Sequence, residues 1–213
     1  MLRIGFIGAG FVANFHTRAL QSVRGATLEA IYAKKGAEEL AQKATACGVG
    51  KPFVASSIAE VCKAVDVVCL FLPNFARVEA LREVMASGAS LRGIVAEKPL
   101  ARNVREAAEV VKLAQGVPTA YFENQIFMPA IINCRRQLDS IEKKMGPPHL
   151  IRTAEEHGGP HEAWFWDPTR QGGGVWCDMG CHSVAVGEAL ATPLGKPIGY
   201  LKPVSVTASM ALL

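Results

Sequence analysis

The sequence predicts an α/β protein that begins with a doubly wound, mostly parallel β-sheet, and three observations support this. Short apolar segments typical of strands alternate with helix-like segments as far as Phe122. The apolar run 67–72 has no polar interruption, which is the pattern of a strand buried on both faces. A glycine-rich turn joins the first strand to the first helix. Such alternation produces right-handed crossovers and a parallel sheet.

The elements of this first part follow from local patterns. Two helix starts have the spacing of a capping box, because Ser57 is followed three residues later by Glu60, and Asn103 by Glu106. The predicted strands are 3–7, 27–32, 52–54, 67–72, 93–96 and 118–122, and the other predicted helices are 11–21, 37–46 and 75–87.

The pattern changes after Phe122, so we place a domain boundary there. Residues 1–122 form the dinucleotide-binding domain discussed below, and 123–213 are expected to form a partial α/β (α+β) open-sheet domain for substrate binding and oligomerisation. In this second part the expected elements are helices at 129–141 and 175–190 and strands at 149–156 and 204–212.

The final expected strand, 204–212, has an unprotected edge. From Ser205 onward it carries no charge and no proline, so it invites pairing with another chain. Two strands alone are marginal without further cover. We therefore expect a truncated chain that associates with itself through this sheet, as a homo-oligomer, and is catalytically poor alone.

Composition excludes several classes of function. Half of the 213 residues are hydrophobic and a fifth are charged, the profile of a globular protein with a sizeable core. The net charge is +4 without any Lys/Arg-rich run, which argues against nucleic acid as a partner. The run 67–72 is far too short to cross a membrane, and no signal-peptide pattern opens the chain. We expect a cytoplasmic protein whose six cysteines remain thiols.

The glycine-rich turn fits a dinucleotide fingerprint of the Rossmann type. Gly8 permits the tight turn, Gly10 lets the backbone approach a pyrophosphate, and Ala13 allows close packing of helix on strand. Phe11 and Val12 open the helix, whose N-terminus supplies amide donors and a positive dipole end. An ordinary glycine turn is the alternative, and the strand–turn–helix context favours the fingerprint.

The end of the second strand bears on the choice between NAD and NADP. An acidic residue that binds the adenine ribose of NAD normally stands there, but this sequence has Lys34 and Lys35. Two cations suit a 2′-phosphate, so NADP is favoured over NAD. The alternative is two solvated lysines in a loop.

Glu97, Lys98 and Pro99 follow the predicted strand 93–96. The carboxyl ends of parallel strands face the ligand crevice in such sheets. Lys98 is therefore placed to reach a substrate hydroxyl or the nicotinamide ribose, although a lone lysine is more often an ordinary surface residue.

A second glycine-rich stretch, 172–174, precedes a helix that carries Asp178 and His182. These two residues are four apart, so a helix presents them on one face, and an Asp that orients a His is an acid–base arrangement. Cys177 and Cys181 raise a zinc-binding alternative, but no second ligand cluster with zinc-like spacing is present and we expect no metal. A core helix with a satisfied histidine is the other alternative.

These four features, in this order, resemble the Gfo/Idh/MocA oxidoreductase family, and the match covers nearly the whole chain. Pro73 and Asn74 are similar to that family's Pro-Asn step beside the nicotinamide ribose. The resemblance implies a Rossmann domain followed by a domain with a large open sheet. It also implies hydride transfer between NAD or NADP and a carbinol of a sugar, cyclitol or related polyol.

The resemblance also implies roles for individual residues. Lys98 would lie near the reacting carbon, His182 would be the general acid and base, and Asp178 would bind substrate and steady His182. The full set of expected cofactor contacts is Gly8, Gly10, Phe11, Val12, Ala13, Lys34, Lys35, Pro73, Asn74, Glu97 and Lys98.

Expected substrate contacts come from the region where the family builds its pocket: Asn124, His157, His161 and Trp164. Aromatic faces suit sugar rings, although the tryptophan could equally pack its loop against the sheet.

The sequence departs from the family pattern at three places. Arg77 stands where a histidine often follows Pro-Asn, Ile126 stands where an arginine is common, and three extra residues precede strand 93–96. The competing class of function is a non-catalytic dinucleotide-binding regulator, because the family also includes co-repressors. The joint presence of Lys98, Asp178 and His182 favours the enzyme.

Overall fold

The computed structural model describes residues 1–156, 158–160 and 162–209, and these residues form two compact units. The first unit comprises Met1–Phe122 and Gly158–Asp178, and the second comprises Glu123–His157 and Met179–Leu213. The assignment of 1–122 and 123–213 to cofactor and substrate binding stays a prediction. No helix in the described ranges is long and apolar enough to span a bilayer.

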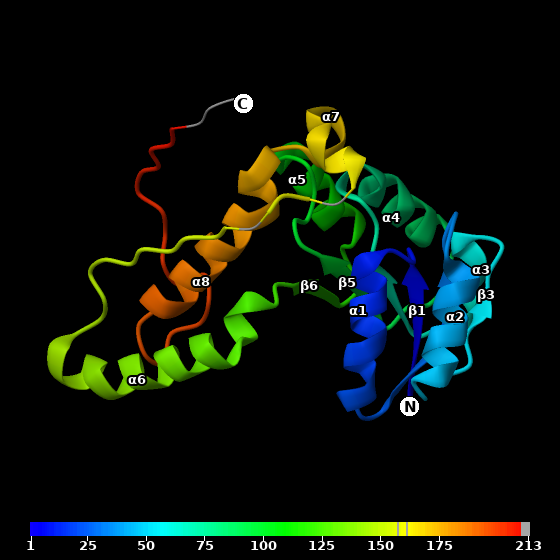
Figure 1. Cartoon of the computed structure of the whole chain (residues 1–213), viewed down its shortest axis with the longest axis horizontal. Coiled ribbons are helices and arrows are strands. Elements are labelled where there is room, and N and C mark those ends of the chain that lie inside the picture. The colour runs from blue at the N-terminus through cyan, green and yellow to red at the C-terminus, as the bar shows by residue number, and fades with distance from the viewer. Residues whose placement is uncertain (157, 161, 210–213) are drawn as a thin grey trace. The chain divides into compact units, whose positions relative to one another are not determined.

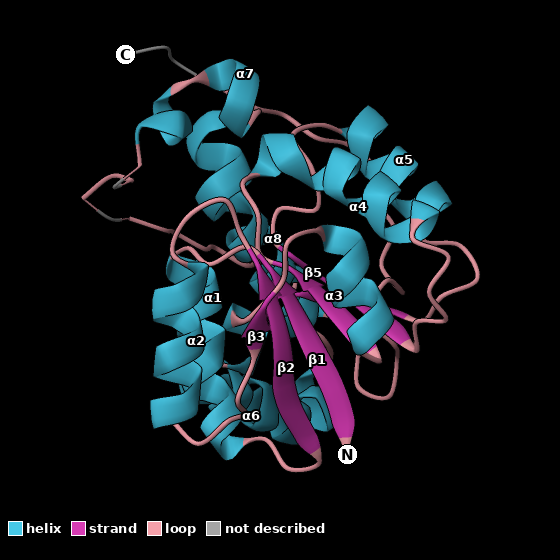
Figure 2. Cartoon of the chain, turned by 90° about the vertical axis from the view of Figure 1, so that its right-hand side faces the viewer, coloured by secondary structure: helices cyan, strands magenta, loops and turns pink. Residues whose placement is uncertain are grey.

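The first unit contains one six-stranded sheet in the order β3-β2-β1-β4-β5-β6, and every neighbouring pair is parallel. This confirms the predicted doubly wound sheet (Figure 2). The strands are β1 Leu2–Ile7, β2 Ala26–Tyr32, β3 Phe53–Val54, β4 Val67–Leu70, β5 Gly93–Glu97 and β6 Thr119–Phe122.

Helices cover both faces of this sheet. On one face lie α1 and α2, and on the other lie α3, α4 and α5 (Figure 2). Their bounds are α1 Phe11–Ala19, α2 Ala37–Ala46, α3 Ile58–Ala64, α4 Arg77–Ala86 and α5 Val104–Leu113.

Side-chain alternation along the strands builds a separate core on each face. In β1, Phe6 packs on the α1/α2 side and Ile7 on the opposite side, because successive strand residues point to opposite faces. In β4, Val68 and Leu70 join Ile7, whereas Cys69 joins Phe6. Both faces of the central strands are therefore apolar and buried, as the uninterrupted run 67–72 predicted.

The two predicted helix caps are present, with a shift in the returning bond. Ser57 Oγ accepts a hydrogen bond from Glu60 N at 3.1 Å, and Glu60 Oε2 accepts one from Ser56 N at 2.7 Å. A capping box would return that bond to Ser57 itself. The helix after Asn103 has the same arrangement. Asn103 Oδ1 accepts a hydrogen bond from Glu106 N, and Glu106 Oε2 accepts one from Arg102 N, the residue before the cap.

The second unit is built on two long helices, α6 Pro129–Met145 and α8 Cys181–Ala191, which lie side by side (Figure 1). Arg135 of α6 donates to the carbonyl oxygens of Ala189 and Thr192 at the end of α8. The last carbonyls of a helix have no partners inside it, so the side chain of Arg135 caps the C-terminal end of α8.

The strand predictions in this unit are wrong for the described residues. Residues 149–156 and 204–209 form no strand, and the rest of the expected final strand, 210–212, lies outside the described residues. A strand exists only where a second strand completes its backbone hydrogen bonds, and the described part of this unit contains none to pair with. The expected association of copies through a sheet stays a prediction.

The first unit also contains two short helical segments from 158–178. They are a 3₁₀ turn at Ala163–Trp166 and α7 at Pro168–Gln171. The helix expected at 175–190 contains a π-helical turn, Trp176–Gly180, and is α-helical at Cys181–Ala191.

Candidate functional site

The glycine turn between β1 and α1 has the geometry expected of a dinucleotide loop. Gly8 has φ +113°, its N–H donates to Tyr32 O at 2.8 Å, and a Cβ there would lie 2.1 Å from Phe71 O. A Cβ at Gly10 would meet nothing within 4 Å, so its backbone is open to a ligand. Ala13 is fully buried and lets α1 pack closely on the sheet.

Gly10 also begins α1 without a side-chain cap. The first N–H groups of a helix have no intrahelical acceptors, and together with the helix dipole they suit a phosphate. Phe11 and Val12 form the first turn, and the Phe11 side chain is 78% exposed. The loop therefore offers backbone and open space where a pyrophosphate would need them.

The two lysines predicted to select NADP lie beside this loop. Lys34 and Lys35 are exposed and follow the end of β2. They precede Gly36, and a Cβ at Gly36 would lie 3.7 Å from Ala9 O, so the two loops are neighbours.

Lys98 lies at the carboxyl end of β5 and is held by Asp178. Its Nζ donates to Asp178 Oδ1 at 3.0 Å and to the Asp178 backbone oxygen at 2.8 Å. The two side chains are 19% and 17% exposed, so the pair is largely desolvated yet still reachable. The following peptide bond, Lys98–Pro99, is cis.

Glu97 has a partner that sequence reasoning missed. His16 Nε2 lies 2.6 Å from Glu97 Oε1, and the imidazole stacks on Phe71 with ring centroids 4.4 Å apart. Glu97 Oε2 accepts a hydrogen bond from Lys98 N at 3.1 Å, so the carboxylate links α1 to the Lys98 turn. The available signal was helical spacing, because His16 follows buried Ala13 by three residues.

Arg77, which the sequence marked only as a departure from the family pattern, is almost completely buried. Its guanidinium donates to Leu72 O at 3.0 Å and to Pro99 O, and its Nε has no partner among the described atoms. Burial lowers the pKa of Arg77 to about 10, so the group still carries its charge at neutral pH. This cation holds the turn after β4 to the turn after β5.

Asn74, the expected ribose contact beside Pro73, is turned inward. It is buried, and its Nδ2 donates to Gln171 O at 2.8 Å. Its role as a cofactor contact stays a prediction, as do the roles of the other expected contacts.

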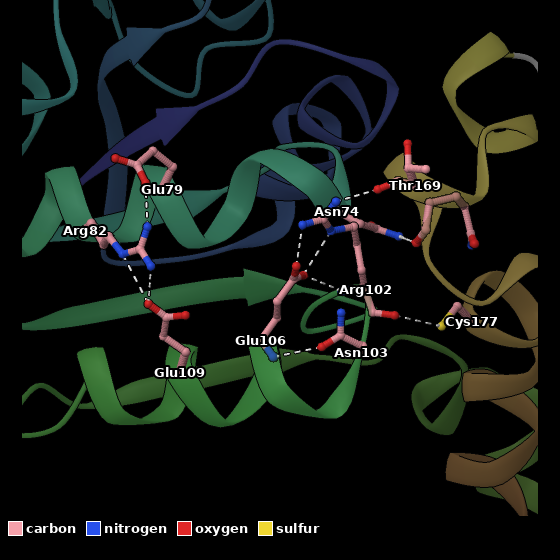
Figure 3. Close-up of polar contacts among 10 residues, drawn as sticks. Asn74, Glu79, Arg82, Arg102, Asn103, Glu106, Glu109, Thr169 and Cys177 are labelled. Carbon is pink, nitrogen blue, oxygen red and sulfur yellow. Dashed lines mark hydrogen bonds and ion pairs between the residues drawn. The ribbon is translucent and has the colours of Figure 1, made fainter.

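Within the glycine stretch 172–174, Gly172 closely approaches protein backbone. Gly172 has φ +106°, and a Cβ there would lie 2.4 Å from Arg102 O. Cys177 Sγ donates to the same carbonyl at 3.9 Å (Figure 3). Arg102 also contacts Thr169 O and pairs with Glu106, as Figure 3 shows. The segment 172–177 is therefore held against the start of α5, and these contacts fix the backbone that leads to Asp178.

His182 lies in the first turn of α8, in the second unit, and its partner there is Glu123. Nδ1 of His182 lies 2.6 Å from Oε2 and 2.8 Å from Oε1 of Glu123. Both side chains are 6% exposed. Sequence reasoning assigned the steadying of His182 to Asp178 and gave Glu123 no role.

The expected substrate residues are only partly described. Asn124 is exposed, and Trp164 stacks on Phe165 at 3.9 Å between ring centroids. Trp164 also meets Phe75 edge-on at 6.1 Å, so it packs against the 3₁₀ turn Asn74–Ala76 that follows β4. His157 and His161 lie outside the described residues.

One group of possible metal ligands occurs among the described residues: Glu123, Cys181 and His182, with ligand atoms within 4.8 Å of one another. A metal between a nitrogen and an oxygen ligand, each about 2.0–2.2 Å away, holds them roughly 3 Å or more apart. The 2.6 Å contact of His182 with Glu123 is a hydrogen-bond distance instead. The geometry fits a hydrogen-bonded pair better than an ion site.

Comparison with known proteins assigns the chain to a family. A model described as the Gfo/Idh/MocA oxidoreductase family with an NAD-binding Rossmann fold matches residues 2–124, and the chain belongs to this family. Inositol 2-dehydrogenase of Rhizobium meliloti is 26% identical over 216 residues, covering 100% of this chain and 59% of the relative. An uncharacterised Saccharomyces cerevisiae protein is 26% identical over 141 residues, 62% of this chain and 38% of its own.

Solved structures show the same fold. The structure of GenD2 from gentamicin A biosynthesis in complex with NAD has a TM-score of 0.76 at 24% identity, covering 92% of this chain and 54% of that chain. Levoglucosan dehydrogenase in complex with NADH gives a TM-score of 0.62 at 18% identity, covering 89% and 54%. The chain therefore spans less than two thirds of the length of each of these relatives.

Proposed function

We propose that the chain acts in an NAD(P)-dependent oxidoreductase that transfers a hydride between the nicotinamide and a carbinol carbon of a sugar, cyclitol or polyol. The observation that carries the proposal is the Lys98–Asp178 pair at the carboxyl end of β5, in a sheet whose first turn is a dinucleotide fingerprint. The related inositol 2-dehydrogenase and levoglucosan dehydrogenase, by their names, act on a cyclitol and an anhydrosugar.

The residues present fit a dinucleotide. The open backbone at Gly10 and the uncapped start of α1 would hold the pyrophosphate, and the loop that carries Lys34 would meet the adenine ribose. When bound, the nicotinamide supplies the hydride acceptor or donor, and the protein supplies alignment and charge.

Three side chains would act on the substrate carbinol. Lys98 places a cation where negative charge develops on the carbinol oxygen, and Asp178 fixes the direction of that ammonium group. His182 takes the hydroxyl proton during oxidation and returns it during reduction. The aromatic group at Phe75 and Trp164 supplies apolar faces suited to a sugar ring.

Turnover of a polyol panel by purified protein tests the chemistry. Lys98→Met and His182→Gln should each lower kcat by about a hundred- to ten-thousandfold while leaving the dinucleotide Kd nearly unchanged. Lys51→Met, which removes an exposed lysine elsewhere in the first unit, is the matched control. Because the chain alone is expected to turn over slowly, support for the enzyme is any polyol-dependent reduction of the dinucleotide that Lys98→Met abolishes. Equal background rates in the wild type and in Lys98→Met would refute the enzyme and favour a regulator.

The preference for NADP rests on Lys34 and Lys35. NADP should bind more tightly than NAD, and the difference should shrink in Lys34→Ala and as salt rises, because an exposed cation–phosphate contact is screened. Lys51→Ala removes the same charge at a distance and should leave the ratio intact. Equal affinities in titration calorimetry would overturn the preference.

A further inference from the structure

We propose that Glu123 is a positioning residue that keeps a proton on Nδ1 of His182, so that Nε2 is the nitrogen that exchanges a proton with substrate. The proposal rests on the proposed function, in which His182 is the general acid and base. It adds a residue that the sequence did not single out, and it assigns the reacting atom of the imidazole.

The contact between the two side chains is specific to one ring nitrogen. Both oxygens of Glu123 approach Nδ1 of His182, at 2.6 and 2.8 Å. Each side chain is 6% exposed, so little water competes for the contact. A shared proton at these distances is a charge-assisted hydrogen bond, which is stronger than one between neutral groups.

The backbone on both sides holds this geometry. Glu123 follows β6 directly, and its Oε1 accepts a hydrogen bond from Gln125 N at 2.7 Å, which fixes the carboxylate against the 3₁₀ turn Gln125–Phe127. That turn packs against α8, whose first turn carries His182. The carboxylate is therefore positioned before any substrate binds.

The chemistry of the two groups then sets the tautomer. An ionised carboxylate only accepts hydrogen bonds, so the ring nitrogen facing it must carry a proton. A neutral imidazole has one proton, and with that proton on Nδ1 the lone pair is on Nε2. Glu123 thus prepares Nε2 as the base and steadies the imidazolium that forms, the part an acidic residue plays in a Ser-His-Asp triad.

Nitrogen-15 NMR of the 213-residue chain tests the tautomer without any assay of turnover. The chain has five histidines, and the His182 signals are assigned by their loss in His182→Gln. Nδ1 should carry a proton at every pH at which the chain stays folded, and Nε2 should be bare when the ring is neutral. An unprotonated Nδ1, or a Nδ1 signal that shifts with stoichiometric zinc, would overturn the proposal.

Variants at Glu123 separate positioning from a merely structural role. A glutamine amide can donate as well as accept, so Glu123→Gln should mix the two tautomers of neutral His182, whereas Glu123→Asp should retain protonated Nδ1. Glu156→Gln, an exposed change in the same unit, is the control and should leave the spectrum unchanged. An identical His182 spectrum in Glu123→Gln would also overturn the proposal.

Kinetics link the tautomer to the reaction. Glu123→Gln should lower kcat at least tenfold with little change in KM, and Glu123→Asp should restore part of the loss. If His182→Gln turns over normally while the wild-type tautomer is as expected, the proposed function fails and the assignment of Glu123 stands. If His182→Gln is inactive but Nδ1 of the wild type carries no proton, the proposed function stands and the assignment of Glu123 fails.

Discussion

Replacing Gly8 by alanine should destabilise the first unit more than a Gly→Ala change at a turn where an added Cβ meets no atoms. Gly8 has φ +113°, where a Cβ is strained, and that Cβ would lie 2.1 Å from Phe71 O. A left-handed backbone costs about 1–2 kcal/mol for a non-glycine residue, and overpacking against backbone costs about 1–3 kcal/mol. The free energy of unfolding should therefore fall by about 2–5 kcal/mol.

Two control glycines separate the cost of the left-handed backbone from the cost of overpacking. Gly88 has φ +66° and no atoms within 4 Å of an added Cβ, so Gly88→Ala carries the backbone cost alone, about 1–2 kcal/mol. Gly10 lies at φ −74° with open space, so Gly10→Ala should leave stability intact or raise it by about 0.4–1 kcal/mol.

Urea denaturation and dinucleotide titration of the three variants measure both effects. Gly10→Ala should weaken dinucleotide binding at least tenfold, about 1.4 kcal/mol, because its methyl group fills the space that a pyrophosphate needs. Gly88→Ala should not change binding. The reasoning is refuted if Gly8→Ala costs no more stability than Gly88→Ala, or if Gly10→Ala binds the dinucleotide like the wild type.

Two further changes probe charged groups of the first unit. Arg77→Ala should lower the free energy of unfolding, measured by urea denaturation, by about 2–6 kcal/mol. The reason is that Leu72 O and Pro99 O each lose a buried donor, worth about 1–3 kcal/mol apiece. A loss below about 0.5 kcal/mol would contradict this. The hydrogen bonds from Arg3 lower the pKa of Asp66 from 3.8 to about 2. A lowered native pKa gives stability that is present above the unfolded pKa, near 4, and lost as pH falls through about 2. Asp66→Asn should therefore flatten the pH–stability curve between these two values. An unchanged slope would argue against this role of Arg3.

The first unit could be predicted from sequence because its signals are local. The uninterrupted run 67–72 marks a strand buried on both faces, and Ser57 and Asn103 mark helix starts by spacing alone. The fingerprint at Gly8 also joins its strand and helix within a few residues. Each of these patterns carries its own physical cause, so no distant residue is needed to interpret it.

The residues that sequence reasoning missed depend on distant partners. Glu97 and His16 are 81 positions apart, and Glu123 and His182 are 59 apart. The strands expected at 149–156 and, among the described residues, at 204–209 are absent for a related reason. Alternation shows that a segment can lie in a sheet, but a strand also needs a neighbour, and its own sequence does not specify one.

The link from His16 through Glu97 to the Lys98 turn should appear as coupling between two substitutions. His16→Phe keeps an aromatic ring on Phe71 but removes the nitrogen that lies 2.6 Å from Glu97 Oε1, and Glu97→Gln keeps the shape of the side chain but removes its charge. In urea denaturation, the double variant should lose less stability than the sum of the single losses, by about 0.5–3 kcal/mol.

A control cycle pairs His16→Phe with Glu83→Gln, an exposed carboxylate on α4, and should be additive within about 0.5 kcal/mol. Additivity in the His16–Glu97 cycle as well would show that the contact contributes nothing. Coupling with unchanged kcat would limit its role to folding. We expect coupling together with a lower kcat, because Glu97 Oε2 accepts the N–H of Lys98 at 3.1 Å, so a displaced carboxylate releases the backbone that carries the ammonium group.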